Sequence, residues 1–131
     1  MPSDSFQAVF NDWADDALVE PIPDNTVAFS FNLAEPWCIE VIGAERYSED
    51  DPDWACDEVF RPKTPSLDLP PEEVGTKWEP VLEAAKSLVL NYLRRESVGA
   101  SRLKQSEAVA IGFVDGDLHT LWSKSGDGLY G

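Results

Sequence analysis

The stretch TVAFSFNLAEPWCIEVI, residues 26–42, decides the fold class of this chain. Apolar residues alternate with small or polar ones up to Leu33, and after residues 34–36 the alternation resumes at Trp37. A two-residue period predicts strands, because successive side chains of a strand point to opposite faces. Two such runs with so short a link predict an antiparallel hairpin, with Leu33 near Trp37 and the turn stiffened by Pro36.

A second hairpin is predicted over residues 109–122. The pair Asp115-Gly116 lies between two alternating runs, and Asp-Gly is typical of a two-residue hairpin turn. Such a loop predicts three facing pairs on one face of the sheet: Phe113 with Leu118, Ile111 with Thr120, and Val109 with Trp122.

Helical spacing marks two further segments. In residues 78–93, apolar side chains recur every three or four positions, which predicts the longest helix. Thr76 and Glu79 fit a capping box at its start. Residues 4–19 predict a short acidic helix capped by Ser5.

Two short strand signals lie between the hairpins, at residues 58–61 and 67–69. The second is bounded by Pro65 and Pro70, as expected of an edge strand. The segment order predicts one α+β domain over residues 1–131. We expect a mainly antiparallel sheet of hairpins packed against one long amphipathic helix, with a short N-terminal helix. Residues 1–3 and 123–131 are expected to fray. The predicted core contains Phe29, Phe31, Ile111, Phe113 and Trp122 from the hairpins, with Trp78, Leu82, Leu88 and Tyr92 from the long helix.

The negative charge of the chain is concentrated in its first 58 residues. They hold 15 acidic residues and one basic residue, Arg46, whereas residues 59–131 hold 10 acidic and nine basic residues. A field of one sign steers a partner of opposite charge, so this division favours a cationic partner. The alternative is that the acidic half only keeps the protein soluble.

Composition indicates a folded cytoplasmic protein. Hydrophobic residues make up 43% of the chain, with five Trp and six Phe, which is more than a disordered acidic tail carries. We see no leader sequence, and no apolar run approaches the roughly 18 residues that a membrane span needs. Cys38 and Cys56 are too few for a secreted disulfide framework, and whether they pair stays open.

The acidic segment of residues 44–57 is the first candidate site. Its carboxylates could ligate Ca²⁺ or Mg²⁺, but Pro52 interrupts the run and no glycine stands where a calcium loop turns, so we expect no metal. Aromatic residues among charges are typical of a protein-docking patch. The predicted partner-binding residues are Tyr47, Glu49, Asp50, Asp51, Asp53, Trp54, Asp57 and Glu58. For Trp54 the alternative is packing beneath the loop.

The sequence carries few features that would indicate an enzyme active site. His119 is the only histidine, with Asp117 two residues away and Ser123 nearby, but no nucleophile motif accompanies them. No phosphate-binding glycine motif occurs, so no cofactor is expected. The one modest basic cluster, from Arg94 to Lys104, is more simply explained by a helix end, and direct nucleic-acid binding is disfavoured by the charge.

Two strings resemble parts of a known class of proteins: residues 54–60, WACDEVF, and residues 111–118, IGFVDGDL. With Trp37 and the acidic content, they resemble small bacterial immunity proteins, which accompany polymorphic toxins. The resemblance implies a protein that binds a cognate toxin domain, often a basic nuclease, and blocks its active site. It implies no catalytic residues.

The first functional hypothesis is therefore a non-enzymatic immunity or inhibitor protein that binds a basic partner. One alternative is a small enzyme or ligand-binding domain that uses a groove between sheet and helix, with His119, Asp117 and Glu40 as its polar groups. A second alternative is a nucleic-acid mimic, in which carboxylates take the place of phosphates.

Overall fold

The alternating stretch forms the predicted hairpin in the computed structural model, which describes residues 2–64, 66–114, 116–124 and 128–129. Strands β1 (Ala28–Ala34) and β2 (Cys38–Ala44) pair antiparallel. Leu33 lies opposite Ile39, so its predicted pairing with Trp37 is wrong. Trp37 belongs to the turn, because three residues rather than a tight pair connect the strands.

Both short strand signals are confirmed, and both strands pair with β2. Strand β3 (Glu58–Phe60) lies antiparallel to the end of β2, and β4 (Ser66–Asp68) lies antiparallel to its beginning. Two short strands thus share one edge of the sheet. Pro65 lies outside the described residues.

The second hairpin is confirmed, but its register is only partly as predicted. Strand β5 (Ala108–Phe113) pairs antiparallel with β6 (Leu118–Ser123), which in turn pairs with β7 (Gly128–Leu129). Val109 lies opposite Trp122, as predicted. A register shift beside this pair then places Ile111 opposite His119 and Gly112 opposite Leu118. The predicted pairs Ile111–Thr120 and Phe113–Leu118 are wrong because a bulge adds one residue to one strand.

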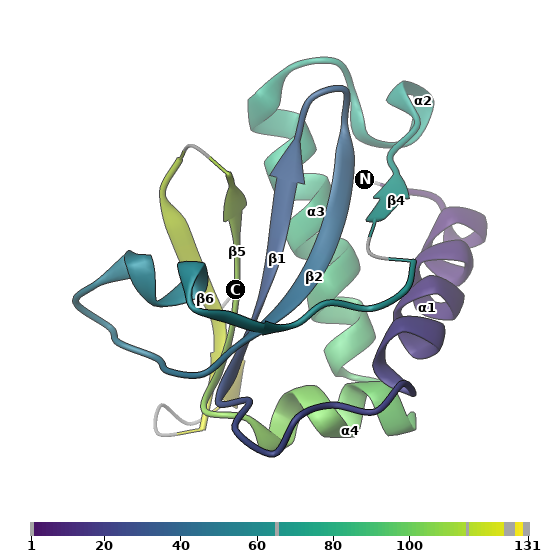
Figure 1. Cartoon of the computed structure of the whole chain (residues 1–131). Coiled ribbons are helices and arrows are strands. Elements are labelled where there is room, and N and C mark those ends of the chain that lie inside the picture. The colour runs from purple at the N-terminus through teal and green to yellow at the C-terminus, as the bar shows by residue number, and fades with distance from the viewer. Residues whose placement is uncertain (1, 65, 115, 125–127, 130–131) are drawn as a thin grey trace.

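The two hairpins join into one mixed sheet rather than a mainly antiparallel one. The strand order is β3-β2-β1-β5-β6-β7, and β1 and β5 are parallel neighbours. A helix between β4 and β5 carries the chain back along the sheet, so β5 starts at the same end as β1 (Figure 1). Such crossover connections produce parallel pairs.

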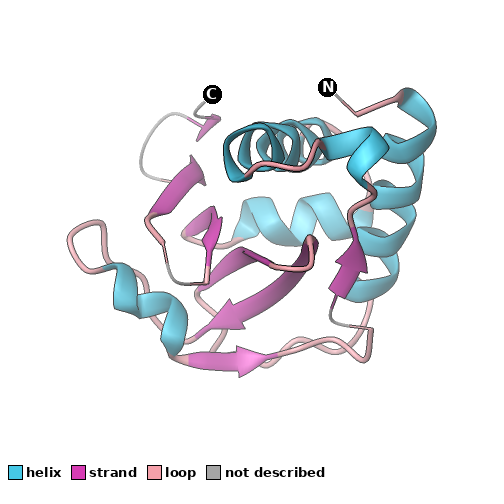
Figure 2. Cartoon of the chain, turned by 90° about the horizontal axis from the view of Figure 1, so that it is seen from above, coloured by secondary structure: helices cyan, strands magenta, loops and turns pink. Residues whose placement is uncertain are grey.

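Helices form a layer on one face of the sheet (Figure 2). Helix α1 (Asp4–Leu18) has 15 residues and α3 (Trp78–Leu93) has 16, so the expectation of one long covering helix is not confirmed. The short α2 (Pro71–Val74) precedes α3, and α4 (Val98–Gln105) follows it. Sequence analysis missed α4, because its eight residues carry too few apolar side chains for a clear period.

Helices α1 and α3 begin at the predicted residues, but their N-caps differ from the predicted ones. Ser3, not Ser5, caps α1 by accepting a hydrogen bond from the backbone N–H of Phe6. Lys77 stands at the N-cap of α3 with no side-chain hydrogen bond, so the Thr76–Glu79 capping box is wrong. Ser97 caps α4 in the usual way, as its hydroxyl accepts from the Ala100 N–H.

Each of the two terminal segments that we expect to fray contains a residue with a defined place in the fold. The backbone N–H and hydroxyl of Ser3 donate to the carboxylate of Glu73, and Ser123 ends strand β6. Residues 1, 125–127 and 130–131 lie outside the described residues.

Six of the nine predicted core residues are buried between helices and sheet, and Phe113 and Trp122 are half-buried against this core. Leu88 and Tyr92 of α3 are fully buried, and the Phe10 ring of α1 is perpendicular to the Tyr92 ring and tilted against the Phe31 ring. Trp13 adds its indole N–H, which donates to the carbonyl of Thr64 and ties α1 to the segment between β3 and β4. Trp78 is the exception, since 56% of it is exposed.

Candidate protein-docking surface

The acidic loop, here defined as residues 45–57, lies over the outer face of the sheet, opposite the helices. Its ends meet through a hydrogen bond from the Glu45 N–H to the Asp57 carbonyl. Its middle forms a 3-10 helix, Pro52–Cys56, and the Asp51 carboxylate caps this helix by accepting from the Asp53 N–H at 3.0 Å. The loop therefore has a defined backbone conformation despite its charge.

Trp54 anchors this loop to the sheet. Only 2% of Trp54 is exposed, and it belongs to a small cluster on the outer face, with Ile42 and four alanines: Ala28, Ala44, Ala108 and Ala110. Tyr47 covers its edge, with ring centroids 5.3 Å apart. The small alanine side chains leave room for the indole. Trp54 thus packs beneath the loop, the alternative that sequence analysis left open.

Arg46 neutralises part of the loop from within. Its guanidinium pairs with the Asp57 carboxylate and, at 3.3 Å, with that of Asp51. The hydrogen bond to Asp57 is the main cause that raises the pKa of Arg46. Asp51 and Asp57 are consequently engaged inside the loop and offer less charge to a partner.

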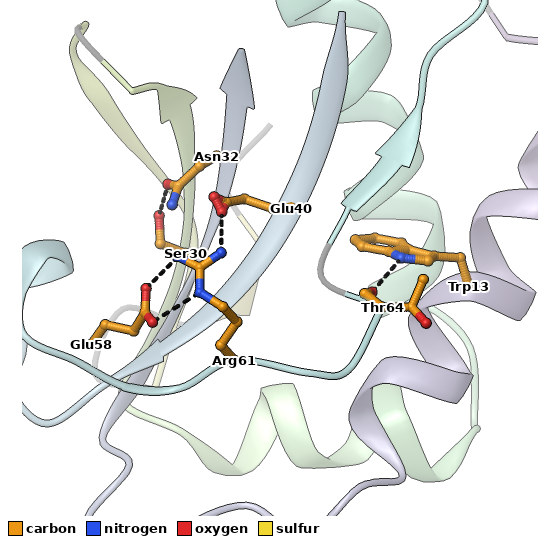
Figure 3. Close-up of polar contacts among 7 residues, drawn as sticks. All are labelled: Trp13, Ser30, Asn32, Glu40, Glu58, Arg61 and Thr64. Atoms are coloured by element: carbon orange, nitrogen blue, oxygen red, sulfur yellow. Dashed lines mark hydrogen bonds and ion pairs between the residues drawn. The ribbon is translucent and has the colours of Figure 1, made fainter.

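Glu58 is engaged in a second ion-pair group on the same side of the sheet (Figure 3). The Arg61 guanidinium donates to both carboxylate oxygens of Glu58, at 3.0 and 2.7 Å, and to the Glu40 carboxylate at 3.0 Å. These hydrogen bonds, that to Glu58 foremost, raise the pKa of Arg61. Beside them the Ser30 hydroxyl donates to the Asn32 side-chain oxygen at 2.7 Å. The contact between Arg61 and Glu40 was not predictable from the sequence, because the two residues are 21 positions apart.

Three of the eight predicted docking residues remain as open carboxylates. Glu49, Asp50 and Asp53 are exposed, and within the described part of the chain no basic side chain pairs with them. Glu49 and Asp50 precede the 3-10 helix and Asp53 lies in its first turn; we call these three residues the open acidic tip. The predicted patch therefore divides into three groups. The open acidic tip is free of ion pairs with the described residues, three further carboxylates (Asp51, Asp57 and Glu58) are paired with arginines, and the two aromatic residues hold the loop in place.

Three other acidic residues of the first half lie far from this loop. Asp4, Asp12 and Asp16 are exposed on α1, which lies on the other side of the molecule from the acidic loop (Figures 1 and 2). Acidic residues of the first half thus lie on at least two separate surfaces. Charge counted along a chain does not show this, because the fold separates neighbouring segments.

The alternative polar groups do not assemble into a site. His119 is half-buried in β6 opposite Ile111, and no hydrogen bond joins it to Asp117 among the described residues. Glu40 is engaged with Arg61, and Asp115 lies outside the described residues.

Both cysteines are free thiols in this structure. Cys38 is half-buried in β2 and Cys56 is exposed at the end of the 3-10 helix. Burial, with the nearby charges of Asp68 and Glu40, raises the pKa of the Cys38 thiol. This favours the unreactive protonated form.

Over the residues that the structure describes, no three His, Cys, Asp or Glu side chains are grouped so that they could hold a metal ion. No helix in the same part of the chain is long and apolar enough to cross a membrane. Comparisons with protein-family models, with curated proteins and with solved structures found no match for the chain.

Proposed function

We propose that this protein is a non-enzymatic binding protein that neutralises a basic protein partner by docking it on the acidic loop. The observation that carries the proposal is the open acidic tip. Glu49, Asp50 and Asp53 are exposed, pair with no basic side chain of the described residues, and stand on a loop fixed by Trp54 and Arg46. The resemblance to immunity proteins adds the class of partner, a basic toxin domain such as a nuclease.

A fixed loop favours this function on energetic grounds. Groups that are already ordered lose little conformational entropy on binding, so more of the interaction energy appears as affinity. Exposed carboxylates contribute mainly to approach, because complementary fields raise the association rate of two proteins. The acidic tip therefore steers the partner toward the loop.

The test is capture of the partner by the immobilised protein from a native lysate at low salt. A loop variant carries Glu49→Lys, Asp50→Lys and Asp53→Lys. A helix variant carries Asp4→Lys, Asp12→Lys and Asp16→Lys on α1, and both variants change the net charge equally. We expect the wild type and the helix variant to retain the same basic protein and release it at high salt. Equal capture by the loop variant would contradict the proposal.

A further inference from the structure

Three hollows meet around Trp37, at the end of the sheet where β1 turns into β2. Glu35 and Trp37 line all three of them. The start of α3 and the end of β5 lie at the same end of the molecule (Figure 1). The hollow between Trp37, Trp78 and Phe113 measures about 430 Å³, enough for one large side chain. We call this region the aromatic end.

Three aromatic rings are gathered at the aromatic end. The Phe113 ring lies 5.7 Å from the Trp37 ring and 6.3 Å from the Trp78 ring, nearly perpendicular to the latter. The indole N–H of Trp37 donates to the Thr76 carbonyl, which fixes its orientation. Trp78 and Val114 are 56% and 60% exposed. An indole that remains open beside other aromatic rings is typical of an interaction hot spot.

The charges around these rings select the kind of ligand. Among the described residues, the acidic ones that line the hollows are Glu35, Asp68 and Glu79, against the basic Lys77. The N-terminus of α3 adds a partial positive charge of about one half, which leaves the surroundings negative. Aromatic faces also attract cations. An arginine satisfies both features, since its planar guanidinium stacks on indoles and pairs with carboxylates.

We propose that the aromatic end binds an arginine side chain of the partner protein, with the guanidinium against Trp78 and facing Glu35. This rests on the proposed function, since it assigns a second contact to the same basic partner. The acidic loop governs approach, whereas the aromatic end slows dissociation.

The probe is the blocked peptide acetyl-Gly-Arg-Gly-amide, compared with the same peptide containing citrulline, which keeps the shape of arginine without its charge. The indole N–H signals of Trp37 and Trp78 are followed by NMR during titration. We expect saturable shifts of both signals with the arginine peptide, and binding of the citrulline peptide weaker by about two- to fivefold or more. Equal binding of the two peptides, or no shift of either indole, would overturn the proposal.

Two variants test the contact residues. Trp78→Ala removes an exposed ring and Glu35→Gln removes a charge, so each should leave the fold intact and weaken arginine-peptide binding about two- to fivefold. In Trp78→Ala the Trp37 signal reports binding. Val98→Ala, at a 62% exposed residue of α4, is the matched apolar control and should bind as the wild type does. If both contact variants, shown folded by their melting curves, bind as tightly as the control, the assignment is wrong.

The peptide also separates this inference from the proposed function. The loop variant with three lysines should bind the peptide normally while losing the partner protein. If the peptide does not bind the wild type while partner capture still depends on the loop, only the arginine site at the aromatic end is refuted. If the peptide binds but the loop variant captures the partner as well as the wild type does, only docking on the acidic loop is refuted.

Discussion

Gly99 is a position at which the general preference of helices for alanine over glycine is reversed. It lies in α4, where alanine normally stabilises a helix by about 1 kcal/mol relative to glycine. A Cβ at this position would overlap the Tyr92 hydroxyl. That hydroxyl donates to the Asp15 carboxylate at 2.7 Å and links α3 to α1, and burial with this hydrogen bond raises the pKa of Tyr92. Gly99 therefore allows the contact between the two main helices.

We expect Gly99→Ala to lower the free energy of unfolding by about 1–3 kcal/mol, because the added methyl group overpacks the contact and disturbs its hydrogen bond. The measurement is urea denaturation. Ser101→Ala in the same helix is the control and should change stability by no more than about 0.5 kcal/mol. A stabilised Gly99→Ala protein would show that the Tyr92–Asp15 contact has little weight.

At the scale of elements, the acidic loop depends on Trp54. Removing this buried indole leaves a cavity over the outer face of the sheet, so we expect Trp54→Ala to cost about 3–5 kcal/mol. Hydrogen exchange of the loop amides should also increase, because the loop loses its anchor. Denaturation and exchange are measured together.

Trp78→Ala is the matched control for that prediction. It makes the same substitution at an indole that is 56% exposed, compared with 2% for Trp54, and should cost much less. Equal losses of stability in the two variants would mean that Trp54 is not the anchor of the loop.

The elements also show what a sequence can reveal about this fold. Periods of two residues and of three to four residues predicted both hairpins and α3, because each element buries one face. The parallel β1–β5 pair was not predictable in this way, since it follows from the path of the chain through α3. The bulge near Leu121 and the exposure of Trp78 could not be predicted from the sequence either. Both depend on neighbours that are distant in sequence.

For the candidate docking surface, the segment was predictable from the sequence but the roles of its individual residues were not. The sequence indicated an acidic loop with aromatic residues, but it could not separate the open carboxylates of Glu49, Asp50 and Asp53 from those that Arg46 and Arg61 engage. Ion pairs depend on the folded position of each base.

At the scale of the whole molecule, exposed carboxylates lie on separate surfaces, among them the acidic loop and α1. Net charge alone would steer a basic partner toward both surfaces. Docking on the loop requires that the loop charges act at close range, within a Debye length of about 8 Å at physiological salt. The two surfaces therefore make an internal comparison, because equal changes of net charge can be placed on either one.

The most direct test of the docking proposal is the association rate of the purified partner with the wild type, the loop variant and the helix variant, each measured at two salt concentrations. Circular dichroism confirms that each variant is folded. We predict that the loop variant associates at least about tenfold more slowly than the helix variant at low salt, and that this difference shrinks at high salt. Equal association rates for the two variants would contradict docking on the acidic loop.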